Sequence, residues 1–277
     1  MFVNVSLPVP LLVVTLVGIL IGGLINVLAD DLPRRRRPSL PHYPDGTPRP
    51  LIAWLGITAF LTGKRASPNG IKLKWRHPLT EIGTALLLVL AILSLVDDPL
   101  MEPVQFVFWV FYLSVFMLIT VIDLEHRLIL FVVIIPSCII ALIDPLVTSY
   151  GVTFGDTILG AVMGFGVFFA LYVGGFLFTY VMAAVQKREI NEVAFGYGDV
   201  MLITLAGLVV GWQSLIFVMF ITVFLGALGA VIFLLARQIS RRGYELFTPL
   251  PYGQYIVIAS VIMLLYANEV AFALRGY

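Results

Sequence analysis

The sequence predicts an all-α membrane protein, a polytopic bundle of about eight transmembrane helices. Three observations predict this fold class. Of the 277 residues, 60% are hydrophobic and only 12% are charged, whereas about 25% of the residues of a soluble domain are charged. The mean hydropathy is +1.04. The apolar residues also come in runs of about 18–25, the length that a helix needs to cross a hydrocarbon core roughly 30 Å thick.

The apolar runs define the expected spans. The sixth and the seventh are separated only by residues 211–214, so we expect them to form a tight hairpin. A further apolar run at 51–61 is too short to span and is expected to be an interfacial or re-entrant segment. The eight expected spans are 8–29, 79–96, 104–122, 128–148, 157–185, 199–213, 215–236 and 253–272.

The chain divides into three expected parts. Residues 1–29 form a first transmembrane helix that stays in the protein, because no basic segment precedes this long apolar run and the arginines follow it. A basic loop follows at 30–78, and a seven-helix membrane core occupies 79–277. The loop is rich in proline and arginine, so we expect it to build no core of its own.

The placement of the basic residues predicts the orientation in the membrane. The net charge of only +1 says nothing about nucleic acid by itself, and we expect no nucleic-acid partner. Of the 17 lysines and arginines, 16 lie in four alternate loops, and only Arg275 lies on the other side. The positive-inside rule therefore makes those four loops cytoplasmic and both termini external. We expect the loop at 30–78 to rest on anionic lipid headgroups, with contact to an acidic segment of a partner as the alternative.

Two aspartates are the candidate catalytic residues. Asp123, in LITVIDLEHRLIL, ends the third span, and Asp199, in FGYGDVMLITL, begins the sixth, so both are expected at the same cytoplasmic depth. Two carboxyl groups a few ångströms apart cannot both ionise. The ionised one can take a proton from water while the protonated one donates to a peptide carbonyl, which is the chemistry of an aspartic protease. This chemistry needs no metal and no cofactor.

Two glycines and a glutamate are the expected supporting residues. Gly196 and Gly198 permit positive φ and the close approach of another backbone, such as an extended peptide substrate. The alternative is an ordinary turn with Asp199 as the N-cap of the next helix. Glu81, at the beginning of the second span, either caps that helix or lies near the aspartates in the same leaflet.

Several separated segments resemble one family, the type IV prepilin peptidases, which are membrane aspartyl proteases of the GxGD group. The resemblance covers nearly the whole chain, in the order of the family. The segments that carry it are GGLINVLADDLP, KWRHPLTEIGTALL, IDLEHRLI, FGYGDVMLITLAGLVVGW, LGALG and LPYGQY.

The resemblance implies a function and a location. The family removes the leader peptide of type IV prepilins and pseudopilins at the cytoplasmic face of the prokaryotic inner membrane, and its two catalytic aspartates fall on Asp123 and Asp199. Many members then methylate the new N-terminus with S-adenosylmethionine, and whether this chain also does so is left open. Residues 79–277 would then be the catalytic core.

The chain also departs from the family. Many members carry paired Cys-x-x-Cys motifs in the first cytoplasmic loop, whereas Cys138 is the single cysteine of this chain and lies in an apolar run. We therefore expect no zinc. Two other function classes stay open: a transporter or channel that uses Asp123 and Asp199 as ion or proton ligands, and a catalytically inactive scaffold. The transporter predicts acids near the membrane midplane.

Overall fold

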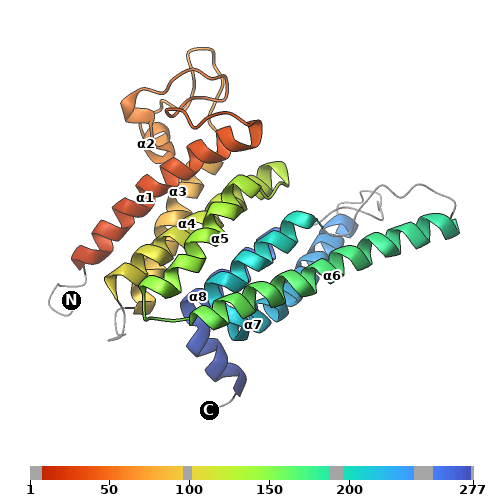
Figure 1. Cartoon of the computed structure of the whole chain (residues 1–277). Coiled ribbons are helices and arrows are strands. Elements are labelled where there is room, and N and C mark those ends of the chain that lie inside the picture. The colour runs from red at the N-terminus through yellow and green to blue at the C-terminus, as the bar shows by residue number, and fades with distance from the viewer. Residues whose placement is uncertain (1–7, 96–101, 187–195, 240–251, 276–277) are drawn as a thin grey trace. The chain divides into compact units, whose positions relative to one another are not determined.

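The structure is a computed structural model that describes residues 8–95, 102–186, 196–239 and 252–275 (Figure 1). Over these residues the fold is α-helical and contains no strand, only two isolated β-bridges, which confirms the predicted all-α class. The chain forms two compact units, Met1–His126 and Arg127–Tyr277. The boundary at residue 126 was not predicted from the sequence, and each unit is described by itself.

The first unit contains three long helices: α1 (Pro8–Asp31), α3 (Arg76–Leu95) and α4 (Pro103–His126). Helices α1 and α3 pack closely because glycines of α1 face the backbone of α3. A Cβ atom on Gly18 would lie 2.5 Å from Cα of Ala85, and one on Gly22 would lie 2.5 Å from Cα of Glu81. Small residues at such contacts let two membrane helices approach each other closely.

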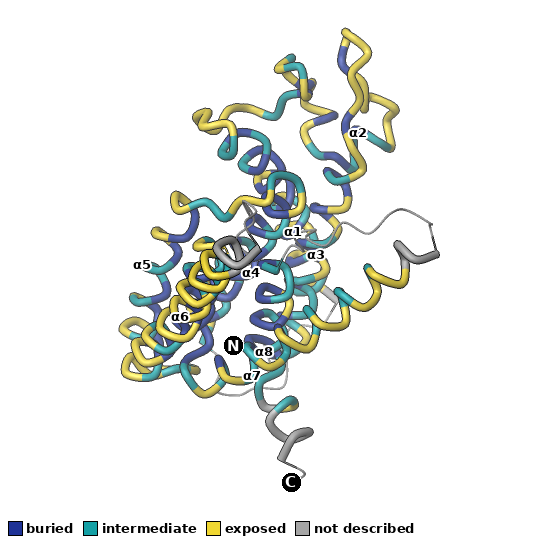
Figure 2. Tube along the Cα trace, turned by 90° about the vertical axis from the view of Figure 1, so that its right-hand side faces the viewer, coloured by how far each residue is buried: buried dark blue, intermediate teal, exposed yellow. Residues whose placement is uncertain are grey.

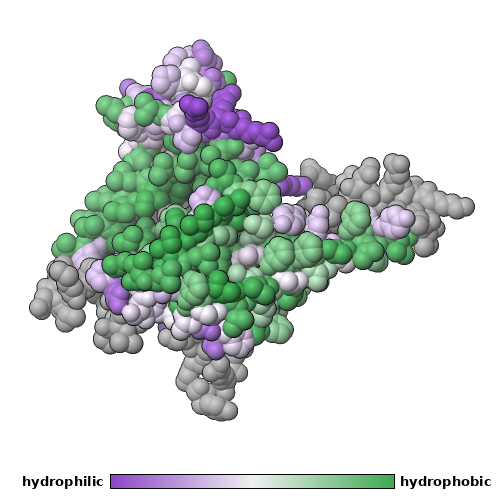
Figure 3. Space-filling view, in the orientation of Figure 1, coloured by the Kyte–Doolittle hydropathy of each residue, from purple (hydrophilic) through white to green (hydrophobic). Residues whose placement is uncertain are grey.

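The loop between α1 and α3 is folded, which corrects the expectation that it has no core of its own. It contains the short helices η1 (Leu32–Arg34), η2 (Leu51–Ala53) and α2 (Gly56–Leu61). Gly46 and Gly70, both with positive φ, allow two tight turns that each close a β-bridge. Figure 3 shows that hydrophilic side chains gather over this loop. Its small core consists of Tyr43, Ala53, Ala59 and Leu73, with Phe60 packed against them.

The second unit contains α5 (Phe131–Val147), α6 (Phe154–Gln186), α7 (Tyr197–Ile239) and α8 (Tyr252–Arg275). Helix α7 is interrupted at Gly211, whose φ of 73° is outside the helical range. The chain reverses there (Figure 1), and Cδ2 of Leu215 lies 3.0 Å from the position of a Cβ atom on Gly207. This reversal confirms the predicted hairpin between the sixth and seventh expected spans.

The length and the composition of the helices indicate a multi-pass membrane protein. Five helical stretches among the described residues are long and apolar enough to cross a membrane, and two more apolar helices are shorter. Helix α6 is largely exposed along its length (Figure 2), and only 11% of its most apolar window is buried. Such an apolar and exposed surface suits contact with lipid. The number of eight spans stays a prediction.

Candidate active site

Asp123 lies near the end of α4, three residues before the final His126, and is buried in the first unit. Two basic residues, the first residue of α3 and one just before that helix, bind the same end of α4. Nζ of Lys74 and Nη1 of Arg76 each lie 3.0 Å from a carboxylate oxygen of Glu125. The backbone that carries Asp123 is therefore joined to the beginning of α3 by ion pairs.

Arg76 extends these ion pairs to the end of α1. Its Nη2 donates to Oδ1 of Asp30 at 2.6 Å, and Nε2 of His77 lies 3.3 Å from Oδ2 of the same carboxylate. Nη2 of Arg49, from the loop, lies 4.0 Å from this oxygen. Burial lowers the pKa of Arg49, and the neighbouring Asp30 opposes this effect. One guanidinium, that of Arg76, thus joins the ends of α1 and α4.

Glu81 caps a different helix from the one that was predicted. It is fully buried in the second turn of α3, so it does not cap that helix. Its carboxylate accepts the backbone N–H groups of Gly56 and of Ile57, the latter at 2.8 Å, and these are the first two residues of α2. Nδ2 of Asn26 in α1 donates to it at 3.3 Å. Glu81 therefore joins α1, α2 and α3.

Asp199 is the third residue of α7 and is partly exposed. Its Oδ2 accepts the N–H of Gly196 at 3.3 Å, and its own N–H donates to the carbonyl of Gly196 at 3.0 Å. This arrangement is typical of a capping box, in which an acid in the first turn binds back to the N-cap residue. The N-cap is therefore Gly196, and the alternative that Asp199 itself occupies that position is wrong.

The two glycines of the motif differ from their prediction, because neither has a positive φ. A Cβ atom on Gly198 would lie 2.8 Å from Cβ of Ile129, so the protein itself occupies the space next to this residue. A Cβ atom on Gly196 would have Oδ2 of Asp199 as its nearest neighbour, at 3.4 Å. Gly198 thus permits packing within the second unit. A role of either glycine toward a substrate stays a prediction.

Tyr197 packs the beginning of α7 against its neighbours. Its ring lies 6.0 Å from that of Phe131 in α5 and 5.7 Å from that of Tyr172 in α6, between centroids. Asp123 belongs to the first unit and Asp199 to the second, so their pairing stays a prediction. Both lie in a terminal turn of a long helix, whereas a transport site would place its acids near the membrane midplane.

Sequence reasoning missed three residues of the first unit: Asp30, Lys74 and Arg76. The charge pattern could have indicated these three residues. Acids at the end of α1 and bases next to the start of α3 lie on the two sides of the same loop. No group of three or more His, Cys, Asp or Glu side chains within the described ranges is placed to hold a metal ion. The expectation of no zinc stays a prediction.

Comparisons with known proteins agree with the motifs. The model of the type IV leader peptidase family matches residues 109–231, a range that includes both aspartates. A prepilin leader peptidase/N-methyltransferase of Aeromonas salmonicida (strain A449) is 28% identical over 221 residues, which are 80% of this chain and 67% of that protein. The protein of the same name from Pseudomonas aeruginosa is 27% identical over 234 residues, again 80% and 67% of the two chains.

A shorter match, to the Escherichia coli (strain K12) protein of that name, is 29% identical over 117 residues, or 42% of this chain and 44% of the other. No solved structure matches this chain significantly. The family model covers the candidate site, and the matches to the Aeromonas and Pseudomonas relatives extend over four-fifths of the sequence. On these grounds the chain is similar to the type IV leader peptidase family.

Proposed function

We propose that this protein is a membrane aspartyl endopeptidase that removes the leader peptide of type IV prepilins or pseudopilins. The observation that carries the proposal is that Asp123 and Asp199 both lie within the family match, each in a terminal turn of a long apolar helix. The charge asymmetry of the loops supports a cytoplasmic position for both turns in the inner membrane of a prokaryote.

The two aspartates would share acid and base duties. The ionised carboxylate takes a proton from a water molecule, whose oxygen attacks the carbonyl carbon of the scissile peptide. The protonated carboxyl donates its proton to the carbonyl oxygen, and the leaving nitrogen takes a proton as the C–N bond breaks. The ion pairs of Glu125 would hold the backbone of Asp123 in place, and the contact with Gly196 would hold Asp199.

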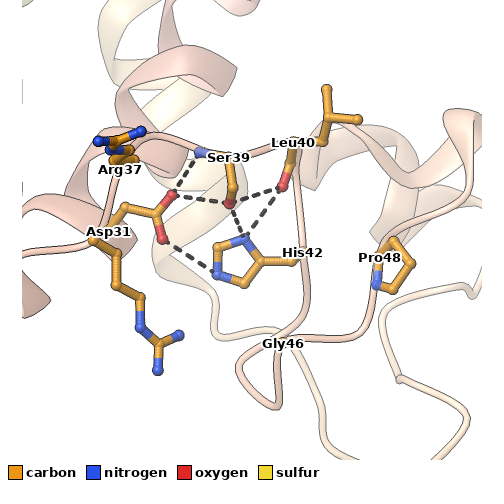
Figure 4. A pocket seen from close by; sticks show the side chains of 8 residues that line it. Asp31, Arg37, Ser39, Leu40, His42, Gly46 and Pro48 are labelled. Atoms are coloured by element: carbon orange, nitrogen blue, oxygen red, sulfur yellow. Dashed lines mark hydrogen bonds and ion pairs between the residues drawn. The ribbon is translucent and has the colours of Figure 1, made fainter.

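Methyl transfer would be a second activity, distinct from the peptidase activity, and the curated relatives are named N-methyltransferases as well. The donor of such enzymes, S-adenosylmethionine, carries a positively charged sulfonium. The pocket at the end of α1 (Figure 4) is lined by Arg36 and Arg37, which repel the sulfonium and attract the carboxylate of the same molecule. The mass of the mature N-terminus of the substrate tests for an added methyl group.

Co-expression with a pilin precursor from the same cell tests the peptidase activity. We expect Asp123→Asn and Asp199→Asn each to abolish leader removal while the protein still inserts into the membrane. The matched control is Asp156→Asn, since an asparagine oxygen can still accept the N–H that Trp212 donates to Asp156 at 2.9 Å. This variant should cleave normally. Full cleavage by either of the first two variants would refute the assignment.

A cross-linking experiment tests the pairing itself. Because Cys138 is the single cysteine, a Cys138→Ala background carries no thiol. In that background we expect Asp123→Cys and Asp199→Cys together to be joined by a short thiol-specific reagent in the membrane. Cleavage by proteases between the two positions, followed by electrophoresis, shows whether the fragments stay joined. Failure to join them with short and longer reagents alike would show that the two residues do not form a pair.

A further inference from the structure

An open pocket of about 440 Å³ lies directly after the end of α1 (Figure 4). It belongs entirely to the first unit and contains neither of the candidate catalytic aspartates. Its walls come from the last residue of α1, from the arginine run that follows, and from the first tight turn of the loop. The residues that line it are Asp31, Arg36, Arg37, Ser39, Leu40, His42, Gly46 and Pro48.

The acidic residue of the pocket is already engaged by its neighbours. Oδ2 of Asp31 accepts the backbone N–H of Ser39 at 2.9 Å and its hydroxyl at 3.0 Å. Nε2 of His42 lies 3.7 Å from the other oxygen, and the side chain of Asp31 is only 2% exposed. Figure 4 shows these three side chains as one hydrogen-bonded group. Both carboxylate oxygens are therefore occupied by contacts within the protein, and the side chain is turned away from solvent.

The basic residues of the pocket are not engaged in the same way. Arg36 and Arg37 are both exposed. Among the residues that the structure describes, no carboxylate forms an ion pair with either guanidinium. A guanidinium binds phosphate through two parallel N–H donors, which makes arginine suited to phosphate recognition. The pocket thus offers two open cations around a carboxylate that is already engaged.

The position of the pocket indicates the source of the phosphate. The apolar stretch that contains α1 ends at Arg34, only two residues before the first arginine of the pocket. Leu40 lines the same pocket and is 69% exposed. A wall that combines arginines with an exposed leucine, at the end of a membrane helix, matches the boundary between lipid headgroups and acyl chains.

We propose that this pocket binds the phosphate of an anionic phospholipid headgroup, with Arg36 and Arg37 as the phosphate ligands and Leu40 in contact with the glycerol and acyl region. The site is distinct from the aspartates, and the proposal does not rest on the peptidase function. Binding there would attach the folded loop to the membrane surface next to the end of α1, through a specific site rather than through general attraction of basic residues.

Native mass spectrometry of the full chain in detergent, titrated with phosphatidylglycerol, tests the proposal. We expect Arg36→Gln/Arg37→Gln to weaken binding about tenfold or more, because it removes both phosphate ligands. The matched control is Arg34→Gln/Arg35→Gln, which removes the same charge from the same segment but outside the pocket lining. The control should keep nearly the full affinity.

Two further arms separate a lipid from a soluble phosphate. Glycerol 3-phosphate is titrated as a competitor, and Leu40→Ser is titrated with both molecules. Weaker binding of the lipid but not of glycerol 3-phosphate to Leu40→Ser supports the lipid headgroup. Equal losses in the two arginine double variants, or no loss in Arg36→Gln/Arg37→Gln, would overturn the site. Displacement of the lipid by glycerol 3-phosphate together with no effect of Leu40→Ser would overturn the lipid as its ligand.

Discussion

The two candidate catalytic aspartates lie in regions that are built differently. Asp123 is buried near the end of α4, where Glu125 forms ion pairs with Lys74 and Arg76, and Arg76 in turn binds Asp30 at the end of α1. Three helices of the first unit are thereby joined at one end. Asp199 is partly exposed in the first turn of its helix, and the contacts described for its carboxylate and N–H are local ones.

Two members of one proposed pair can thus depend on different kinds of structure. The position of Asp123 depends on residues up to 93 positions away, because Asp30 contributes to the same set of ion pairs. The position of Asp199 depends on a helix start and on the packing of its neighbour Gly198. Loss of an ion pair should therefore disturb the first region, and overpacking near the motif should disturb the second.

The largest effect is expected for Arg76→Met in the first region. It leaves Asp30 and Glu125 without the guanidinium that joins them, and breaking a largely buried ion pair from one side costs about 3 kcal/mol. The side chain of Arg76 is only 12% exposed. We expect a clearly lower unfolding midpoint in detergent, measured by chemical denaturation, and weaker leader cleavage.

Lys74→Met is the matched control, because Lys74 binds the same carboxylate but is 72% exposed. Exposed ion pairs contribute about 0–1 kcal/mol, so this variant should differ little from the parent protein. Equal losses of stability in the two variants would mean that burial does not strengthen the ion pair of Arg76. The position of Asp123 would then not depend on buried ion pairs in the way proposed here.

The next largest effect is expected for Gly198→Ala in the second region. The added Cβ would lie 2.8 Å from Cβ of Ile129, and overpacking of this kind costs about 2 kcal/mol. Because the start of α7 has to shift, cleavage should fall more than the unfolding midpoint does. Gly196→Ala is the comparison variant, since its added Cβ has its nearest neighbour 3.4 Å away and it loses only the smaller preference for glycine at the N-cap. If the comparison variant loses as much cleavage, the contact with Ile129 is not the cause.

The sequence was sufficient for features that depend on composition and on local pattern. Long apolar runs predicted the helical membrane fold, and the short segment 211–214 between two of these runs predicted the reversal of α7, because both signals lie within the segment that they describe. Asp123 and Asp199 were placed at helix ends for the same reason. The structure confirms these positions but leaves the pairing of the two acids untested.

Features that depend on contacts distant in sequence were not predicted. Glu81 binds the start of α2, 25 residues earlier, and Gly198 faces Ile129, 69 residues earlier. Neither contact produces a periodic pattern in the sequence from which it could be predicted. The core of the loop between α1 and α3 was missed because its composition is polar on average, whereas the four apolar residues that form the core are spread over 31 positions, from Tyr43 to Leu73.

A smaller effect is expected for Glu81→Gln, which tests how far the first region depends on remote contacts. The N–H groups of Gly56 and Ile57 bind different oxygens of Glu81, so the amide can accept only one of them and turns a donor toward the other. The loss should be about 1 kcal/mol. We expect limited proteolysis to cut the segment 51–61 faster than in the parent protein. An unchanged rate would show that Glu81 does not hold α2 in place.

The smallest effect on stability is expected for a variant of Asp45. Its carboxylate lies in the first tight turn of the loop between α1 and α3, outside the membrane helices. Its Oδ1 accepts the hydroxyl of Thr47 at 2.7 Å, and its Oδ2 accepts Nδ2 of Asn69, from the second tight turn, at 3.1 Å. Hydrogen bonds, first from Ser67 and then from Thr47, lower the pKa of Asp45 from 3.8 to about 2. Asp45 therefore joins the two turns most strongly when it is ionised.

The sign of the pH dependence follows from this lowered pKa. The stabilisation by Asp45 is fully present above about pH 4 and is lost as the pH falls toward 2. The difference between the unfolding midpoints of the parent protein and Asp45→Asn should therefore shrink over that interval and stay constant above it. A difference that grows as the pH falls would contradict the assignment. Asp45 would then be a carboxylate whose contribution depends on hydrogen bonds within and between turns rather than on buried ion pairs.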